Sequence, residues 1–128
     1  METKPNTPAP VLTEADLAQF TGTDNWYRHG LVRSVLYTDG CKYVAETAGA
    51  YWLIDEIALA QKFSRPVRRE EFQVWTLKRN QEGNGAKLEC GDGNGNRVYV
   101  KRIELTDFPL REITFYFENS VICLPAER

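Results

Sequence analysis

One apolar stretch near the middle of the chain decides the fold: Ala48-Gly-Ala-Tyr-Trp-Leu-Ile-Asp-Glu-Ile-Ala-Leu-Ala-Gln-Lys-Phe63. When this stretch is drawn as a helix, its apolar residues share one broad stripe, which contains Leu53, Ile54, Ile57, Ala58 and Ala60. So wide a stripe predicts burial against a sheet, or against a sheet and a second subunit. We therefore expect a helix from about residue 49 to residue 63, and we expect Pro66 to stop it.

The segment before this helix carries the signals of a short second helix. Residues 1–11 contain three prolines, and we expect them to form a flexible arm. Thr13 fits a helix N-cap, with Asp16 three residues later as the acid of a capping box. Gly22 is expected to end this helix. The remaining residues, 12–128, are predicted to form a single domain.

On both sides of the central helix, apolar residues alternate with period two, as is typical of strands. Residues 35–38 and 41–44 flank Asp39-Gly40, which predicts a hairpin with a type I′ turn. Residues 21–30 are expected to form a loop. From residue 71 onward, alternating runs and turns continue to the end of the chain. A change of parity between Lys101 and Arg102 predicts a β-bulge.

These patterns predict the α+β fold class. We expect an antiparallel sheet of about seven strands joined as hairpins. One short N-terminal helix and one long central helix are expected to pack on that sheet.

Length and composition exclude several classes of protein. With 128 residues, 42% of them hydrophobic and 27% charged, the chain resembles an ordinary globular domain. The net charge of −2 argues against a protein that binds DNA or RNA polymers. No segment resembles a signal peptide or a membrane span, and the three cysteines, Cys41, Cys90 and Cys123, lack the spacing of a disulfide framework or a zinc site. We therefore expect a cytoplasmic protein with reduced thiols.

The motifs that could carry metal or acid–base chemistry fail on spacing. The run Asp92-Gly-Asn-Gly-Asn96 begins like a calcium loop, but Arg97 stands where the loop needs glycine and Ile103 where it needs glutamate. A plain hairpin loop is the favoured interpretation, although Asn94 could still hydrogen-bond a base or a ribose. His29 is the only histidine, and an incidental loop position is favoured over a catalytic one. We predict no catalytic residue, no metal and no cofactor.

Arginines beside aromatic residues are the remaining candidates for a binding site. Arg28, Arg102 and Arg111 each lie near aromatic residues or at a strand break, where a guanidinium could hold a phosphate. Trp75 and Phe108 could stack on a base. Cation–π packing at the surface explains the same neighbours equally well. The basic cluster at residues 65–69 is interpreted as a solvated loop in preference to a phosphate site.

Seven short runs, spread over residues 13–125, carry a family resemblance. They read Thr13-Glu-Ala-Asp-Leu-Ala-Gln-Phe20, Asn25-Trp-Tyr-Arg28, Leu36-Tyr-Thr-Asp-Gly40, Ala50-Tyr-Trp-Leu-Ile-Asp55, Phe72-Gln-Val-Trp75, Thr106-Asp-Phe-Pro-Leu110 and Cys123-Leu-Pro125. Together they resemble the first Thoeris anti-defence family of phage proteins and related small mobile-element proteins. The resemblance implies a homo-oligomeric sponge, which binds a cyclic ADP-ribose-type immune signal, or a cyclic oligonucleotide, and leaves it unchanged inside the infected bacterium.

Three functions therefore stay open at the level of sequence. The first is a sponge for a cyclic nucleotide signal, with ligand-binding residues Arg28, Trp75, Asn94, Arg102, Phe108 and Arg111. The second is a small inhibitor that binds a host defence protein directly. The third is an enzyme that acts on a nucleotide. The sponge is favoured because of the family resemblance and the arginines beside aromatic residues, and it is compatible with the lack of a visible catalytic pair.

Overall fold

The computed structural model describes residues 11–128, and the expected arm at residues 1–11 lies almost entirely outside them. In chain order the elements are α1 (Glu14–Ala18), β1 (Trp26–Arg28), β2 (Leu36–Thr38), α2 (Asp39–Thr47), α3 (Tyr51–Phe63), α4 (Arg65–Arg68), β3 (Phe72–Arg79), β4 (Ala86–Gly91), β5 (Arg97–Ile103), β6 (Glu112–Glu118), β7 (Val121–Cys123) and the 3₁₀ turn η1 (Pro125–Glu127). The strands form one sheet of order β1-β2-β7-β6-β3-β4-β5.

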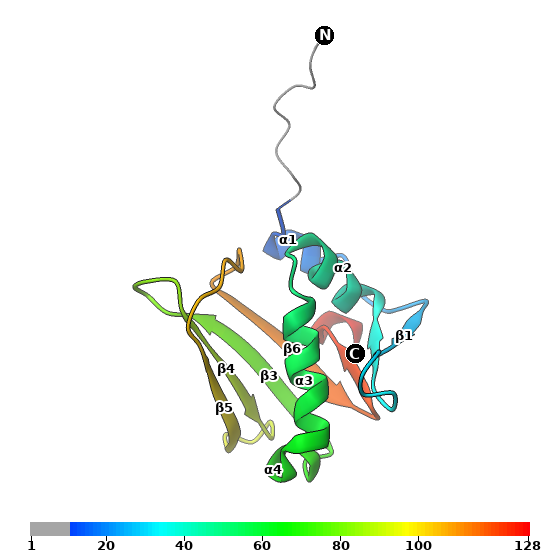
Figure 1. Cartoon of the computed structure of the whole chain (residues 1–128). Coiled ribbons are helices and arrows are strands. Elements are labelled where there is room, and N and C mark those ends of the chain that lie inside the picture. The colour runs from blue at the N-terminus through cyan, green and yellow to red at the C-terminus, as the bar shows by residue number, and fades with distance from the viewer. Residues whose placement is uncertain (1–10) are drawn as a thin grey trace.

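The α+β class and the count of seven strands are confirmed, but the sheet is mixed. All neighbouring strands run antiparallel except β2 and β7, which pair in parallel through Leu36 with Val121 and Tyr37 with Ile122. The parallel pair arises because the chain leaves β2 into three helices, α2, α3 and α4, and reaches β7 only after β3 to β6 have formed. In Figure 1, α3 crosses the sheet, with α2 at one end of it and α4 at the other.

The central helix is confirmed, and its apolar stripe packs on the sheet. Five residues of α3 are buried: Leu53, Ile54, Ile57, Ala58 and Ala60. The sheet meets them with buried side chains from several strands, among them Trp75, Leu77, Leu88, Phe115 and Phe117. Gly49, with φ of +62°, separates α2 from α3 in the left-handed conformation that suits glycine after a helix. The helix therefore begins two residues later than expected.

The predicted hairpin around Asp39-Gly40 is wrong, because α2 begins there. The Thr38 side chain accepts a hydrogen bond from the Cys41 backbone N–H, as an N-cap does. The Glu127 carboxylate accepts hydrogen bonds from the Gly40 N–H at 2.8 Å and from the Thr38 hydroxyl at 2.6 Å. A Cβ on Gly40 would lie 2.7 Å from Glu127 Oε1, so this glycine serves a close approach and not a turn.

The smaller expectations had mixed outcomes. The capping box of α1 is confirmed, with Thr13 and Asp16 bonded reciprocally, although the helix ends at Ala18 and not at Gly22. The segment expected to be a loop contains the short strand β1.

The predicted bulge between Lys101 and Arg102 is wrong, because β5 continues through these residues. The register changes instead between Cys90 and Gly91 of β4. Pro66 lies inside the short helix α4, at a position in the first turn that proline tolerates.

Candidate functional site

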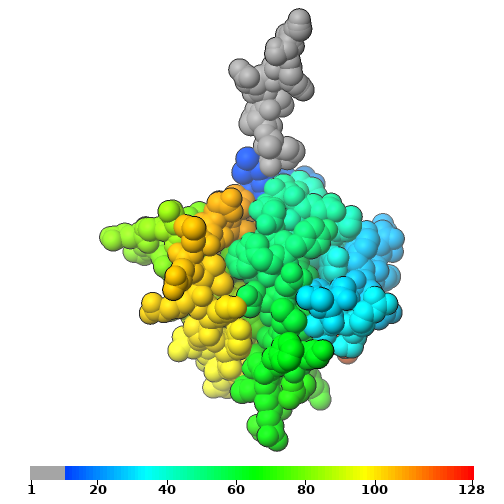
Figure 2. Space-filling view, viewed as in Figure 1, coloured from blue at the N-terminus to red at the C-terminus, as the bar shows by residue number. Residues whose placement is uncertain are grey.

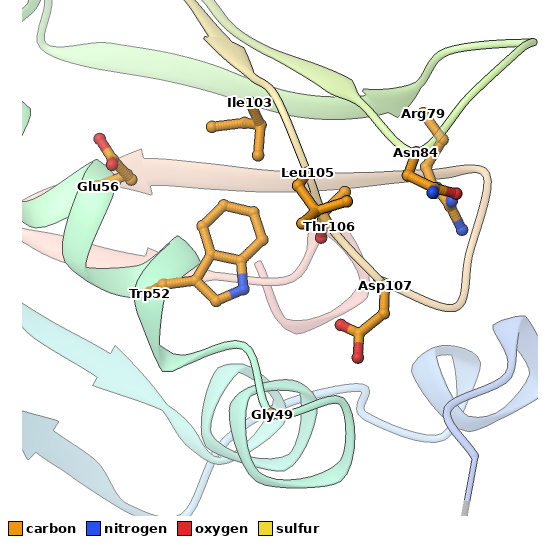
Figure 3. Close-up of a pocket in the computed structure, with 9 residues that line it drawn as sticks. All are labelled: Gly49, Trp52, Glu56, Arg79, Asn84, Ile103, Leu105, Thr106 and Asp107. Carbon is orange, nitrogen blue, oxygen red and sulfur yellow. The ribbon is translucent and has the colours of Figure 1, made fainter.

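A cleft lies between α3 and the segment that follows β5. Its volume is about 870 Å³, and it is lined by Gly49, Trp52, Glu56, Arg79, Asn84, Ile103, Leu105, Thr106 and Asp107. Figure 3 shows the indole of Trp52 on one side, facing Ile103 and Leu105, with Arg79, Asn84 and Asp107 towards the other. The lining therefore combines an aromatic ring, aliphatic side chains, an amide and charges of both signs.

Two walls of the cleft are held by regular structure and by backbone hydrogen bonds. Trp52 and Glu56 stand one turn apart on α3, so both side chains lie on the same edge of the helix. On the opposite wall, the Thr106 N–H donates to the Asn84 carbonyl at 2.7 Å. This hydrogen bond connects the segment after β5 with the loop between β3 and β4. The Phe108 N–H donates to the Thr106 hydroxyl at 3.1 Å. The polar side chains of the cleft thus stand on a fixed frame.

Arg79 is the most informative residue of the cleft. It ends β3, and its backbone N–H donates to the Arg111 carbonyl at 2.8 Å. Its Nη1 donates to the Phe108 carbonyl, also at 2.8 Å. Its Nε is buried, yet it meets no hydrogen-bond acceptor in the part of the chain that the structure describes. A buried donor without an acceptor costs about 1–3 kcal/mol, so an acceptor brought by a ligand would relieve that cost.

The two carboxylates of the cleft differ in their surroundings. Glu56 forms an ion pair with Lys101 of β5, with 2.6 Å between Nζ and Oε2. The hydrogen bond to Glu56 raises the pKa of Lys101 above its usual range, so Lys101 stays charged at neutral pH. Asp107 has no ion-pair partner among residues 11–128. Arg79 and Asp107 are therefore the charges that the cleft presents to a ligand.

Two of the residues predicted to bind ligand lie in the core. Trp75 is fully buried, and its Nε1 donates to Gln73 Oε1 at 2.8 Å. Phe108 is also buried. Phe108 reaches the cleft only through its carbonyl, which holds Arg79. Their rings are thus unavailable for stacking on a ligand in this structure.

The other four predicted residues are exposed, and the structure does not bring them together. Arg102 lines a neighbouring hollow of about 520 Å³, which shares Asn84 and Ile103 with the cleft. Arg111 supports the cleft through its backbone carbonyl, which accepts from the Arg79 N–H. Asn94 lies in the loop between β4 and β5, which is the expected hairpin loop. Arg28 lies on β1, at the opposite edge of the sheet from β5.

Sequence reasoning missed the residues that line the cleft most prominently: Trp52, Arg79 and Asp107. Trp52 was interpreted as part of an apolar helix. Glu56 follows it by four residues and lies on the same side of the helix, which indicates that Trp52 is at the edge of the apolar stripe. Arg79 has the same parity in β3 as the buried residues Trp75 and Leu77, so the alternation of the strand indicated that its side chain points towards the core face. No local signal singles out Asp107.

His29 serves the structure. It is 4% exposed, and its Nδ1 accepts hydrogen bonds from the backbone N–H groups of Leu31 and Val32 at 3.1 and 3.0 Å. Its Nε2 therefore carries the proton, and it lies 2.7 Å from Asp55 Oδ1. The ring ties the loop after β1 to α3. The interpretation of His29 as a non-catalytic loop residue fits these contacts, although the residue is buried.

Neither a metal site nor a reactive thiol accompanies the cleft. Within residues 11–128, no three side chains of histidine, cysteine, aspartate or glutamate gather closely enough to hold a metal ion. All three cysteines are free, and burial raises the pKa of the Cys90 thiol to about 12 and that of Cys123 to about 11. None of the helices in this part of the chain is long and apolar enough to cross a membrane.

Comparison with known proteins identifies the family of the chain. A family model described as a family of unknown function, DUF6876, matches residues 11–128, and the chain belongs to this family. No curated protein and no solved structure matches the chain. The matched residues coincide with the part of the chain that forms the sheet, the helices and the cleft.

Proposed function

We propose that this member of DUF6876 is a small-molecule-binding protein, whose cleft holds a nucleotide-type ligand and releases it unchanged. The observation that carries the proposal is Arg79, whose buried Nε meets no acceptor within residues 11–128, in a cleft that also presents the ring of Trp52. The resemblance of the sequence to anti-defence proteins supports a cyclic ADP-ribose isomer or a cyclic oligonucleotide as that ligand. The proposed role is to sequester this immune signal during phage infection.

The lining of the cleft supports a nucleotide on chemical grounds. Guanidinium donors pair with phosphate oxygens, and an indole offers a stacking surface to a base. Asp107 can accept hydrogen bonds from ribose hydroxyls, and the Asn84 amide can both donate to and accept from a base edge. A volume of about 870 Å³ falls in the range of pockets that bury small ligands, which runs from roughly 300 to 1,000 Å³.

The same lining favours binding over turnover. The nine residues of the cleft include no cysteine, histidine, lysine or serine, and the hydroxyl of Thr106 accepts the Phe108 N–H. Of the two carboxylates, Glu56 is engaged by Lys101, and only Asp107 has no ion-pair partner within residues 11–128. An enzyme acting on a nucleotide is therefore the less favoured function.

Titration with defined probes tests the proposal. Cyclic ADP-ribose isomers and cyclic di- and trinucleotides are added to the protein, and binding is measured by calorimetry and native mass spectrometry. We expect one of these compounds to bind and to be recovered intact after denaturation. Arg79→Gln should weaken binding at least about tenfold, because a charge-assisted hydrogen bond contributes about 1.5–3 kcal/mol. Lys78→Gln is the matched control, because its exposed side chain lies next in the strand and on the opposite face.

The outcomes separate the open functions. If none of the probes binds, or if both variants weaken binding equally, the cleft is not the site of a nucleotide. If the recovered mass differs from that of the added probe, the protein is an enzyme. The oligomeric state, which native mass spectrometry reports in the same experiment, tests the predicted homo-oligomer.

A second candidate function, direct inhibition of a host defence protein, is favoured by the face of the sheet opposite α3. On that face Phe72 and Tyr116 are half-buried, with ring centroids 5.2 Å apart, and Val100 is 43% exposed. The Arg128 guanidinium lies over both rings, 4.5 Å from the centroid of Phe72 and 5.6 Å from that of Tyr116, so the face offers Val100 and a cation together. A partly apolar sheet face of this kind is suited to contact with another protein. A charge placed there, as in Val100→Glu, should then abolish capture of a defence protein while leaving ligand binding unchanged. If capture survives that substitution, this face is not the contact.

A further inference from the structure

A second pocket lies at the other end of α3 from the cleft and is basic. It is formed by the loop after β1 and by the junction of α3 with α4, and its volume is about 470 Å³. The residues that matter in its lining are Leu31, Arg33, Ser34, Lys62 and Arg68. In Figure 2 the cyan surface of this loop lies beside the green surface of α3 and α4. No carboxylate lines this basic pocket.

The cations around this pocket have no carboxylate partners. Arg33, Lys62 and Arg68 line it, and three more arginines, Arg28, Arg65 and Arg69, belong to the same two segments of the chain. None of the six forms an ion pair within residues 11–128. Four cations elsewhere, Lys78, Arg79, Arg102 and Arg111, are also unpaired there, so what distinguishes this pocket is that three unpaired cations line one hollow. Like charges kept together without counter-charges are unfavourable unless an anion joins them.

Two of the guanidinium groups are held in place by backbone carbonyls. Arg68 donates through Nη1 to the Lys62 carbonyl at 2.8 Å, near the C-terminus of α3. Arg28 donates through Nη1 to the Arg33 carbonyl. Each guanidinium retains further N–H donors, because an arginine has five. Such anchoring reduces the side-chain entropy that an anion must overcome when it binds.

The distribution of charge favours a compact anion over a long one. The whole chain carries a formal charge of −2, so the residues outside these six cations carry −8 together. A polymer that extended beyond the pocket would meet this negative surface, whereas a small anion would meet only the cations. The pocket also has a hydroxyl in Ser34, which can donate to an anionic oxygen.

We infer that the basic pocket is a second binding site, which takes a small ligand bearing two or more phosphate groups. Arg33, Lys62 and Arg68 neutralise the phosphates, and Ser34 donates a hydrogen bond to one of their oxygens. This site is independent of the cleft, because the two share no lining residue and lie at opposite ends of α3.

Inorganic pyrophosphate is the probe that tests this site. We expect saturable binding with one equivalent, measured by calorimetry, and a shift of the Ser34 amide resonance with the same dissociation constant. Arg33→Gln and Lys62→Gln should each weaken binding at least about tenfold. These two are chosen because their charged groups make no hydrogen bond or ion pair within residues 11–128. Arg102→Gln, an exposed arginine distant in the sheet, is the control and should change binding by less than about twofold.

Several results would overturn the inference. They are the absence of saturable binding, equal weakening by Arg102→Gln, or a single-stranded oligonucleotide that binds more tightly than pyrophosphate and displaces it. Thermal melting of each variant shows whether the fold is kept. The proposed function is tested with nucleotides and Arg79→Gln, and this inference with pyrophosphate and Arg33→Gln; because the two sites share no lining residue, failure of the one is distinguishable from failure of the other.

Discussion

The two ends of β3 carry polar side chains on the same face, and the structure treats them in opposite ways. At the first end, Gln73 is fully buried, and its amide donates to the Gln61 side chain and to the carbonyls of Val67 and Glu70, at 2.9–3.0 Å. Its oxygen accepts from Trp75 Nε1 and from the Gln61 amide. At the last end, Arg79 keeps a buried Nε without an acceptor in the described chain.

The difference between these ends explains where the molecule is closed and where it is open. A polar network with every member partnered fixes the position of α4 and of the end of α3 against the sheet. An incompletely partnered group is costly in a core, but useful in a cleft, where a ligand can complete it. We therefore expect substitutions at the closed end, around Gln73, to change stability, and substitutions at the open end, around Arg79, to change ligand binding.

The largest effect is expected for tryptophan at the closed end. Trp75→Ala should lower the free energy of unfolding by about 4 kcal/mol, because it leaves a large cavity and removes the donor to Gln73. Trp52→Ala, in the cleft, should cost only about 1–2 kcal/mol, because Trp52 is half-buried. Chemical denaturation measures both. Equal costs would contradict the division into a closed and an open end.

The second effect concerns the amide network itself. Gln73→Leu keeps the volume of the side chain but leaves the Glu70 carbonyl and the Trp75 N–H without a partner among residues 11–128, whereas the Val67 carbonyl keeps the Glu70 N–H. We expect the free energy of unfolding to fall by about 3 kcal/mol, since each buried unpaired group costs about 1–3 kcal/mol. Gln81→Leu, at an exposed loop position, is the control and should change stability by less than about 0.5 kcal/mol. A neutral Gln73→Leu would mean that the network adds no stability.

The third prediction concerns the open end of β3, where a substitution should affect ligand binding and not stability. Arg79→Met removes a buried donor that has no acceptor in the described part of the chain, together with the side-chain hydrogen bond to the Phe108 carbonyl, so stability should change by less than about 1 kcal/mol. Ligand binding in the cleft should nevertheless be lost. Denaturation and calorimetry on the same preparation separate the two effects. A loss of stability as large as that of Gln73→Leu would make Arg79 a structural residue.

The features that could be predicted from the sequence are those encoded by residues close together in the chain. The capping box at Thr13 and the apolar stripe of α3 lie within a few residues, and both predictions were confirmed. α2 was missed because a contact from Glu127, 87 residues away, helps to hold its first turn. In β3 both faces carry apolar residues, so alternation could not decide that Trp75 points into the core.

The cleft was beyond the reach of sequence for a related reason. Trp52, Arg79 and Asp107 come from three separate segments. The pairing of β3 with β4, and of β4 with β5, brings Arg79 and Asp107 together, and the packing of α3 on the sheet adds Trp52. Arginines next to aromatics in the sequence were a poor guide, because neighbours in a strand point to opposite faces. The predicted α+β class depended on patterns within segments, whereas the site depends on contacts between them.

The smallest effect is expected for Asp39, a polar residue at the surface whose carboxylate is fully hydrogen-bonded. Asp39 opens α2 and accepts hydrogen bonds from the Tyr27 hydroxyl at 2.8 Å and from the Asp24 and Asn25 N–H groups at 3.0 and 3.2 Å. These bonds, the one from Tyr27 first, hold the pKa of the Asp39 carboxyl at about 2, below its ordinary value of about 3.9.

Because the folded state lowers this pKa, Asp39 stabilises the fold above its ordinary pKa and loses that contribution as the pH falls towards 2. The melting temperatures of the native protein and of Asp39→Asn should therefore differ by a constant amount above about pH 5 and converge between about pH 4 and pH 2. Asp24→Asn, whose own side chain accepts none of these bonds, should show no such convergence. If the gap for Asp39→Asn persists at pH 2, the hydrogen bonds act through geometry and not through the charge. Complete partnering would then stabilise the surface in the same way as it stabilises the buried end of β3.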